Sequence, residues 1–123
     1  MRYDAGEVIT AMITPFNEDL TIDYPSLKKL INHLIDTGSD AILVAGTTGE
    51  TPTLSHEEEA HMFTFVKNAV EGRVKIIMGA GSNSTQTAVE SSVMAKKLGA
   101  DAILSVVPYY NKPSQKGMYE HFA

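Results

Sequence analysis

The chain has 123 residues, of which 43% are hydrophobic and 20% are charged, so it can bury one core and matches the composition of a globular domain. Its net charge of −5 and the lack of a basic stripe argue against nucleic-acid binding. The absence of cysteine excludes disulfides, thiolate metal sites and cysteine nucleophiles. No apolar run reaches the roughly 20 residues of a membrane span, and the N-terminus lacks a signal-peptide core, so we expect a cytoplasmic protein without membrane contact.

Short apolar runs alternate with stretches that repeat apolar residues at helical spacing. The apolar runs predict four buried strands, over residues 8–13, 41–45, 75–78 and 102–107. The stretches between them predict three helices, which run from N-caps at Asp23, Ser55 and about Ser84 to glycine stops at Gly38, Gly72 and Gly99. A fourth helix is predicted to begin near Gly117. Since strands buried on both faces belong to parallel sheets, the pattern indicates an α/β protein with a parallel sheet.

The predicted helices carry signals for their ends and for their buried faces. Ser55 and Glu58 have the spacing of a capping box at the start of the second helix. We expect the core side of this helix to contain Met62, Val66, Ala69 and Val70. In the third helix the same spacing rule selects as buried residues Val89, Val93, Met94 and Leu98.

One segment recurs two predicted strand–helix units later. Gly38-Ser-Asp-Ala-Ile-Leu-Val44 returns as Gly99-Ala-Asp-Ala-Ile-Leu-Ser105, which repeats a helix stop, an aspartate and an apolar strand. Serial units of this kind build both doubly wound sheets and (β/α)8 barrels, so the pattern alone leaves both open. A barrel takes about 250 residues. Residues 1–123 would then be the N-terminal portion of a single barrel domain, truncated in its fourth helix, and we expect an incomplete piece of a longer chain.

The loop after the second predicted strand has the sequence Gly46-Thr47-Thr48-Gly49-Glu50. It leaves the carboxyl end of a buried strand, which is where α/β folds hold their ligands. Glycines let the backbone approach a ligand closely and the two hydroxyl groups add donors, so the loop suits a small carboxylate or phosphate. A tight strand-to-helix turn without a ligand explains the same residues, and both interpretations stay open.

Two other patterns do not support a ligand. Gly79-x-Gly81-x-x-Ser84 follows a strand as a dinucleotide fingerprint would, but its third glycine is missing and the acidic residue falls at Asp101, outside a strand end. His56 and His61 lie five positions apart, which turns the second histidine roughly 140° away from the first on a helix. We therefore expect neither a bound nucleotide nor a metal site.

Two adjacent phenols follow the fourth predicted strand, in the segment Pro108-Tyr109-Tyr110-Asn111. In a parallel sheet they lie on the same rim as Thr47 and Thr48. A phenol keeps its proton at neutral pH and can pass it along a chain of hydroxyl groups, so these residues could form a proton relay. Aromatic residues that fill a loop or a subunit interface also fit the pattern.

Four motifs together resemble the dihydrodipicolinate synthases, which are pyruvate-dependent class I aldolases. They are Thr14-Pro-Phe16, Gly46-Thr-Thr-Gly-Glu50, Gly79-x-Gly-Ser-Asn83 and Pro108-Tyr-Tyr-Asn-Lys-Pro-Ser-Gln115. The resemblance covers the whole chain in order and spacing. It implies a (β/α)8 TIM barrel with parallel strands, of which this chain would hold about four βα units.

The resemblance also implies an activity in lysine and diaminopimelate biosynthesis. In these enzymes a barrel lysine forms a Schiff base with pyruvate, and the enamine then attacks aspartate semialdehyde. Thr48 would bind the pyruvate carboxylate, Thr47 would relay protons, and Tyr110 would complete the relay in the neighbouring subunit's site. The resemblance implies a homotetramer, built as a dimer of dimers with Tyr109 and Tyr110 at the interface, and no cofactor.

Parts of the family's machinery do not match this chain. The Schiff-base lysine and the arginine that receives the second substrate would lie beyond residue 123, so we expect the chain alone to be inactive. In lysine-inhibited members the effector site corresponds to Thr51, His56, Asn83 and Tyr109. Glu59 replaces a histidine of that site and Thr87 replaces a carboxylate. The missing carboxylate predicts weak lysine feedback.

Two other functions are compatible with the sequence. The chain could belong to another pyruvate-dependent lyase, acting on sialic acid or a keto-deoxy sugar acid. It could instead be a non-catalytic half-barrel that lacks the nucleophile and binds small carboxylates or assembles with a partner. Borohydride trapping with pyruvate separates an aldolase from such a binding module.

Overall fold

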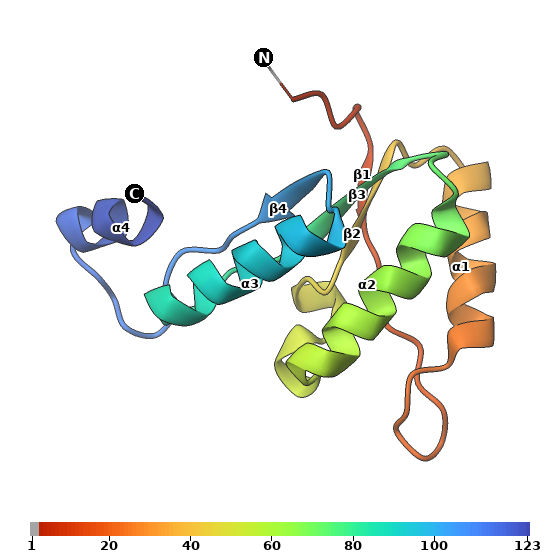
Figure 1. Ribbon diagram of the computed structural model, residues 1–123, viewed down its shortest axis with the longest axis horizontal. Helices are drawn as coiled ribbons and strands as arrows, with labels where there is room; N and C mark the ends of the chain where they lie inside the picture. The colour runs from red at the N-terminus through yellow and green to blue at the C-terminus, as the bar shows by residue number, and fades with distance from the viewer. Residues whose placement is uncertain (1–2) are drawn as a thin grey trace.

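The computed structural model describes residues 3–123 and contains one sheet of four parallel strands (Figure 1). The strands are β1 (Ile9–Ala11), β2 (Ala41–Val44), β3 (Lys75–Gly79) and β4 (Ala102–Leu104). The helices are α1 (Tyr24–Asp36), α2 (His56–Val70), α3 (Thr85–Leu98) and α4 (Gln115–Phe122). Two short 3-10 helices lie between β2 and α2, η1 (Thr47–Gly49) and η2 (Thr51–Thr53). Among residues 3–123 no helix has both the length and the apolar character that crossing a bilayer requires.

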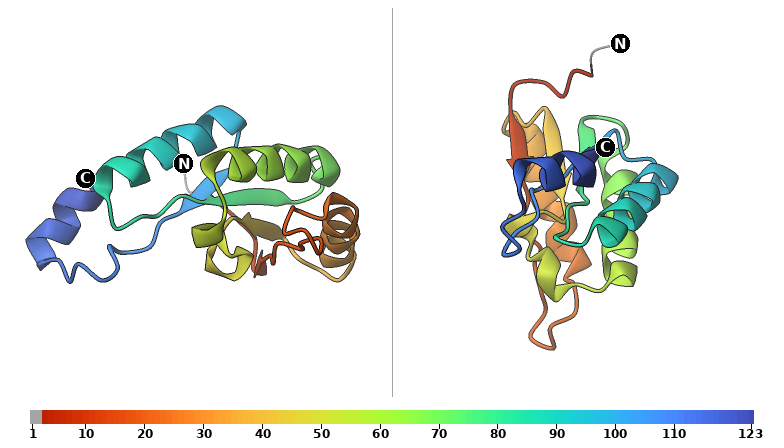
Figure 2. Two further views of the ribbon diagram at one scale, coloured as in Figure 1. Left: turned by 90° about the horizontal axis from the view of Figure 1, so that it is seen from below. Right: turned by 90° about the vertical axis from the view of Figure 1, so that its left-hand side faces the viewer.

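The strands lie in the sheet in the order in which the chain makes them, β1-β2-β3-β4, and each neighbouring pair is parallel. Crossovers between parallel strands are right-handed, so strands that are added successively in one direction keep their helices on one face. A doubly wound sheet instead reverses its direction of growth part-way. The order therefore confirms the serial winding of a barrel, and Figure 2 shows the sheet with α2 and α3 along the same side of it.

The main core lies between the sheet and helices α1 and α2. The buried sheet residues of this core are Ile42, Val44, Ile76 and Met78. The helix residues packed with them are Leu27, Ile31, Met62, Phe63, Val66 and Val70. A smaller cluster of Ala41, Leu43 and Ile77 completes the burial of the two central strands. Burial of both faces explains why the sequences of β2 and β3 are continuously apolar.

The helix starts follow the predictions from sequence. The carboxylate of Asp23 accepts the N–H of Ser26 at 3.0 Å and caps α1. Ser55 and Glu58 make both hydrogen bonds of a capping box at the start of α2. Ser84 caps α3. Local side-chain chemistry therefore decides where these three helices begin.

Two helix boundaries lie two residues before the predicted positions, each for a local reason. The second helix does not run to Gly72, because α2 ends at Val70 and Glu71 takes the left-handed position with φ 52°. Arg73 reaches back there, and its Nε donates to the carbonyl of Val70 at 3.0 Å. The fourth helix begins at Gln115, two residues before Gly117, since Ser114 serves as its N-cap.

The two outer strands are shorter than predicted. The apolar runs 8–13 and 102–107 become the three-residue strands β1 and β4. Each of these strands pairs with one neighbour only among the described residues, and the ladders end at Ala11 opposite Leu43 and at Leu104 opposite Gly79. Apolar side chains beyond the ladder are consequently exposed, including Ile13 and Val107.

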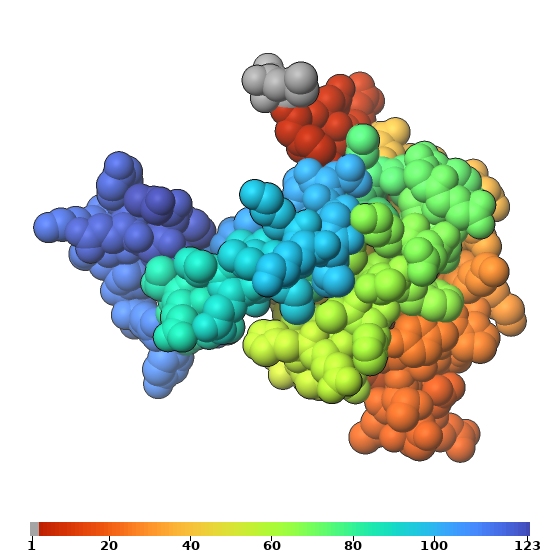
Figure 3. All heavy atoms as spheres, viewed as in Figure 1, coloured from red at the N-terminus to blue at the C-terminus, as the bar shows by residue number. Residues whose placement is uncertain are grey.

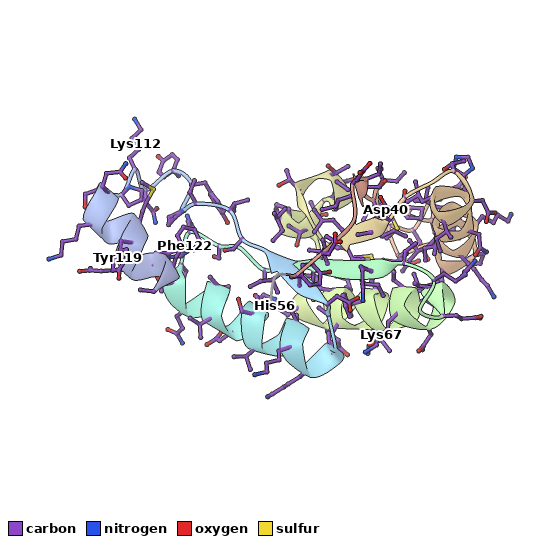
Figure 4. The ribbon with its side chains drawn as sticks, turned by 90° about the horizontal axis from the view of Figure 1, so that it is seen from above. Asp40, His56, Lys67, Lys112, Tyr119 and Phe122 are labelled. Atoms are coloured by element: carbon purple, nitrogen blue, oxygen red, sulfur yellow. The ribbon has the colours of Figure 1, made fainter. Side chains whose placement is uncertain are left out.

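The buried face of α3 was predicted in part: Met94 and Leu98 pack against the core as expected, but the two valines do not. Val89 and Val93 are 56% and 46% exposed, whereas Ala88 and Ala95 are buried. Alanine lets the helix approach its neighbours closely, and the valines then fall on the outer side. Lys67 of α2 helps to fix this placement, because its Nζ donates to the carbonyl of Leu98 at 3.0 Å, at the end of α3 (Figure 4).

Helix α4 lies apart from the other helices, beyond the N-terminal end of α3, and forms a separate lobe in the space-filling view (Figure 3). Two polar contacts connect this region to the rest of the chain. The Thr85 hydroxyl lies 2.8 Å from Nδ1 of His121, and Nδ2 of Asn111 donates to the carbonyl of Asn83 at 3.0 Å.

The recurring aspartate of the sequence makes the same interstrand connection in both of its copies. Asp40, just before β2, accepts the N–H of Val8 at 2.8 Å and donates its own N–H to the Val8 carbonyl at 2.9 Å. Asp101, just before β4, makes the same two bonds to Ile76, both at 2.9 Å. These bonds fix the start of β1 against β2 and of β3 against β4.

Asp40 receives a further N–H, that of Glu7, at 2.9 Å. The backbone hydrogen bonds from Val8 and then from Glu7 hold the pKa of the Asp40 carboxyl below its ordinary value of 3.8. Because the pKa is lower in the folded state, the ionised carboxylate stabilises that state at any pH above the unfolded value. This stabilisation is lost as the pH falls through the folded-state pKa.

We predict that Asp40→Asn lowers the thermal midpoint at pH 7 and that the difference from wild type shrinks as the pH falls through the lowered folded-state pKa of Asp40, because the wild-type carboxyl then becomes neutral as well. Thermal unfolding between pH 7 and pH 2.5 measures this. Glu18→Gln, on the exposed turn after β1, removes the same charge and serves as the control. A difference from wild type that does not change with pH would contradict the assigned role of the carboxylate.

Candidate functional site

The loops at the carboxyl ends of β2, β3 and β4 surround a cavity of about 650 Å³. The first turn of α2 and one side of α3 complete its wall. The polar and aromatic side chains that line it include Thr47, Thr51, His56, Glu59, Thr87 and Tyr109. The cavity therefore lies at the end of the strands where α/β barrels hold their substrates.

The turn η1 gives the β2 loop its shape. The carbonyl of Gly46 accepts the N–H of Gly49 at 3.0 Å, and the carbonyl of Thr47 accepts the N–H of Glu50 at the same distance. Glu50 ends the turn in the left-handed conformation, with φ 59°. Thr47 and Thr48 open the turn, so their N–H groups have no partner within it. Thr47 lines the cavity, and Thr48 is exposed beside it.

Glycine forms the cavity wall where β2 and β3 end. A Cβ on Gly79 would overlap the carbonyl oxygen of Ala45, the residue after β2. A larger residue would therefore separate the two strands at the position where their loops must diverge. The backbones approach each other this closely because Gly79 has no side chain.

Glu59 is a buried carboxylate in the cavity wall, with 7% of its surface exposed. The hydroxyl of Thr51 donates to its Oε1, and Nδ1 of His56 lies 3.3 Å from its Oε2. Figure 4 shows His56 in the first turn of α2, near α3. The His56 side chain is 68% exposed, so the contact with Glu59 is largely open to solvent on the histidine side and its Coulomb energy is small.

The two tyrosines after β4 take different positions. Tyr109 lines the cavity, whereas Tyr110 is 95% exposed and lies outside the lining set. Tyr110 also has a left-handed backbone, with φ 67°. A non-glycine residue in that region carries strain, and such residues concentrate at functional sites.

The structure therefore unites four of the seven residues selected from sequence around one cavity, namely Thr47, Thr51, His56 and Tyr109. Thr48 and Tyr110 face solvent. Asn83 is half-buried next to the cavity, and its carbonyl accepts the side chain of Asn111 at 3.0 Å. Among residues 3–123 no group of three or more His, Asp or Glu side chains is placed to hold a metal ion.

Comparisons of the sequence and the structure with known proteins identify the family to which this chain belongs. The sequence profile of the Dihydrodipicolinate synthetase family matches residues 4–123. The chain belongs to this family. It is 55% identical over 119 residues to the 4-hydroxy-tetrahydrodipicolinate synthase of Dehalococcoides mccartyi, which covers 97% of the chain and 40% of that protein. The chain thus spans about two fifths of the length of the curated relatives it matches.

Solved dihydrodipicolinate synthases have the same fold over this region. The chloride-inhibited enzyme from Acinetobacter baumannii, complexed with pyruvate, has a TM-score of 0.94 at 44% identity, covering 97% of this chain and 41% of the other. The enzyme from Cyanidioschyzon merolae with lysine bound has a TM-score of 0.92 at 52% identity, covering 96% and 40%. The four strand–helix units are therefore the N-terminal part of the family's TIM barrel.

Sequence reasoning missed several polar residues at this end of the sheet. Thr14 and Ser82 are buried hydroxyls in the loops after β1 and β3, and Ser91 lines the cavity from α3. Thr14 stood within a motif used for the family resemblance, but no role was assigned to it. The sequence did contain a signal for Thr14: it is a hydroxyl residue directly after a predicted apolar strand, where a buried polar group needs a hydrogen-bond partner.

We predict that Gly79→Ala destabilises the chain by about 1–3 kcal/mol or more, because the added methyl group collides with backbone. Gly117→Ala is the matched control: its Cβ would meet only Pro113 and Ser114, both at 3.5 Å. Alanine in α4 should leave stability unchanged or raise it slightly. Chemical denaturation of the two variants measures the difference, and equal stabilities would count against the close approach at Gly79.

Proposed function

We propose that this chain supplies the N-terminal half of the site of an enzyme that condenses pyruvate with aspartate semialdehyde in lysine and diaminopimelate biosynthesis. Membership of the dihydrodipicolinate synthetase family is the observation that carries the proposal. A related enzyme, 44% identical to this chain, has been solved in complex with pyruvate. The position of Thr47 on the cavity wall supports a role close to a small substrate.

The proposed chemistry divides between this chain and residues beyond it. A lysine outside residues 1–123 forms the Schiff base with pyruvate, and the enamine carbon attacks the aldehyde carbon of the second substrate. Thr48 binds the pyruvate carboxylate through its hydroxyl and the N–H groups at the start of η1, which favour an anion. No resident cofactor is required by this scheme.

Thr47 and Tyr110 serve as the proton relay in the proposal. Thr47 lies at the cavity wall, while Tyr110 points into solvent with a strained backbone. That exposure suits a phenol that extends into the site of a second subunit. The proposal therefore includes a homo-oligomer, a dimer of dimers, in which Tyr109 and Tyr110 lie at the interface between two copies.

The test is to trap the full-length gene product with pyruvate and borohydride and to assay it with aspartate semialdehyde. We expect a covalent adduct on the full-length protein and none on residues 1–123 alone. Thr48→Val should raise the KM for pyruvate roughly 10–100-fold, because a hydrogen bond to a charged group is lost. Thr47→Val should lower kcat roughly 100-fold or more, because a proton-transfer step is impaired.

Thr64→Val is the control, since this exposed residue of α2 uses its hydroxyl only on the carbonyl of Ala60, at 2.8 Å. Activity at the wild-type level in Thr47→Val would contradict the relay. An adduct with pyruvate but no turnover of aspartate semialdehyde would indicate another lyase of the superfamily. Absence of any adduct on the full-length protein would indicate a non-catalytic member.

Weak feedback by lysine is the regulatory part of the proposal. A relative, the Cyanidioschyzon merolae enzyme, binds lysine. In this chain Thr87 stands where lysine-inhibited members have a carboxylate, and it lines the cavity. The carboxylate that this chain does have there, Glu59, accepts a hydrogen bond from Thr51 and contacts His56, so part of its acceptor capacity is already used.

We predict that millimolar lysine barely inhibits the full-length enzyme and that Thr87→Glu increases its sensitivity roughly tenfold, the effect of one added charge-assisted hydrogen bond. Initial rates against lysine concentration measure this. The control is Thr85→Glu, which adds the same charge two residues before Thr87 on α3, at a position outside the cavity lining. Strong inhibition of the wild-type enzyme would refute the prediction.

A further inference from the structure

The buried hydroxyl of Thr14 connects the end of β1 to the turn η1. Thr14 is 4% exposed, and its Oγ1 donates to the carbonyl of Gly49 at 2.7 Å. The thioether of Met62 lies behind the hydroxyl, at 3.6 Å. A buried hydroxyl that is held between two elements in this way has little freedom to choose another partner.

Both backbone polar groups of Gly49 have hydrogen-bond partners. Its N–H donates to the carbonyl of Gly46, and its own carbonyl accepts from Thr14. A Cβ on Gly49 would lie 3.1 Å from the carbonyl of Met12 and 3.3 Å from Oγ1 of Thr14. The end of η1 therefore packs directly on the backbone that follows β1, and there is little space in which the turn could shift.

The backbone around Thr14 is itself anchored. The N–H of Met12 donates to Leu43 of β2 at 3.1 Å, and the carbonyl of Pro15 accepts the N–H of Asp23, the N-cap of α1, at 2.9 Å. An isolated β-bridge between Phe16 and Ile22 closes the loop that the bond between Pro15 and Asp23 spans. Thr14 thus extends from a fixed segment toward a short turn. Two backbone hydrogen bonds of 3.0 Å lie within that turn, and a longer one of 3.4 Å, from the N–H of Thr51 to the carbonyl of Gly46, closes across it.

We propose that Thr14 is a positioning residue that holds η1, and with it Thr47 and Thr48, in the orientation that binds the substrate carboxylate. This inference rests on the proposed function, because it needs η1 to contact pyruvate. Thr14 acts through Gly49 and does not contact the substrate. Displacement of a binding group by about 1 Å is enough to cost a large part of its effect, so one buried hydrogen bond suffices for the role.

The test is Thr14→Val, which keeps the shape of the side chain and removes the donor. We expect the KM for pyruvate to rise about tenfold, the effect of one lost hydrogen bond, with a smaller change in kcat. Thr14→Ser, which keeps the hydroxyl, should restore the KM. In amide hydrogen exchange, Gly49 and Glu50 should exchange faster in Thr14→Val than in wild type.

Thr10→Val is the matched control, since Thr10 lies in β1, four residues before Thr14, and its hydroxyl is 2.7 Å from that of Ser39, which precedes β2 at the amino end of the sheet. It should lower stability and leave the KM for pyruvate unchanged. A purely structural role for Thr14 would give the same result in Thr14→Val, and a wild-type KM in that variant overturns the proposal. If Thr14→Val does not fold, Thr14→Ala replaces it, since alanine also removes the donor, and a wild-type KM there overturns the proposal equally.

The two proposals fail in distinguishable ways. If wild-type full-length protein forms no adduct with pyruvate, the proposed function fails whatever the Thr14 variants do. If wild type forms the adduct and condenses its substrates but the Thr14 variants bind pyruvate normally, only the positioning role fails.

Discussion

Register between buried parallel strands is the constraint on which the rest of this structure depends. A slip of one residue would exchange the two faces of a strand, and both faces of β2 and β3 are apolar, so side-chain polarity alone specifies their register poorly. Asp40 and Asp101 supply part of the missing specification: Asp40 connects β2 to Val8, just before β1, and Asp101 connects β4 to Ile76 of β3, each through two hydrogen bonds. With the strand starts fixed, the strand ends and their loops meet at a defined level.

Much of the fold could be predicted because its signals are local. Helix starts at Asp23, Ser55 and Ser84 depend on hydrogen bonds to residues three positions ahead, which the sequence displays directly. The lengths of β1 and β4 could not be predicted in this way, since they depend on pairing with a strand that is distant in sequence. Part of the buried face of α3 was missed because Ala88 and Ala95, weakly apolar residues, face the core in preference to Val89 and Val93.

The location of the candidate site could be predicted better than the directions of its side chains. Parallel strands bring their carboxyl ends to one edge, which is why Thr47 and Tyr109 could be expected together. The outward position of Tyr110 depends on a left-handed backbone at a tyrosine, which no local preference favours. Thr14 was not predicted either, because its partner is a backbone carbonyl, and sequence does not show which carbonyl a hydroxyl will meet.

The identical bonding of Asp40 and Asp101 also bears on how such a chain is assembled over evolutionary time. The smallest recurring module comprises two strands, the helix between them and the glycine and aspartate that precede the second strand. Each module contains the aspartate that aligns its own two strands. Copying a gene segment of this size in tandem would therefore carry along the bonds that align its own two strands, and only the pairing between successive modules, as between β2 and β3, would have to form anew.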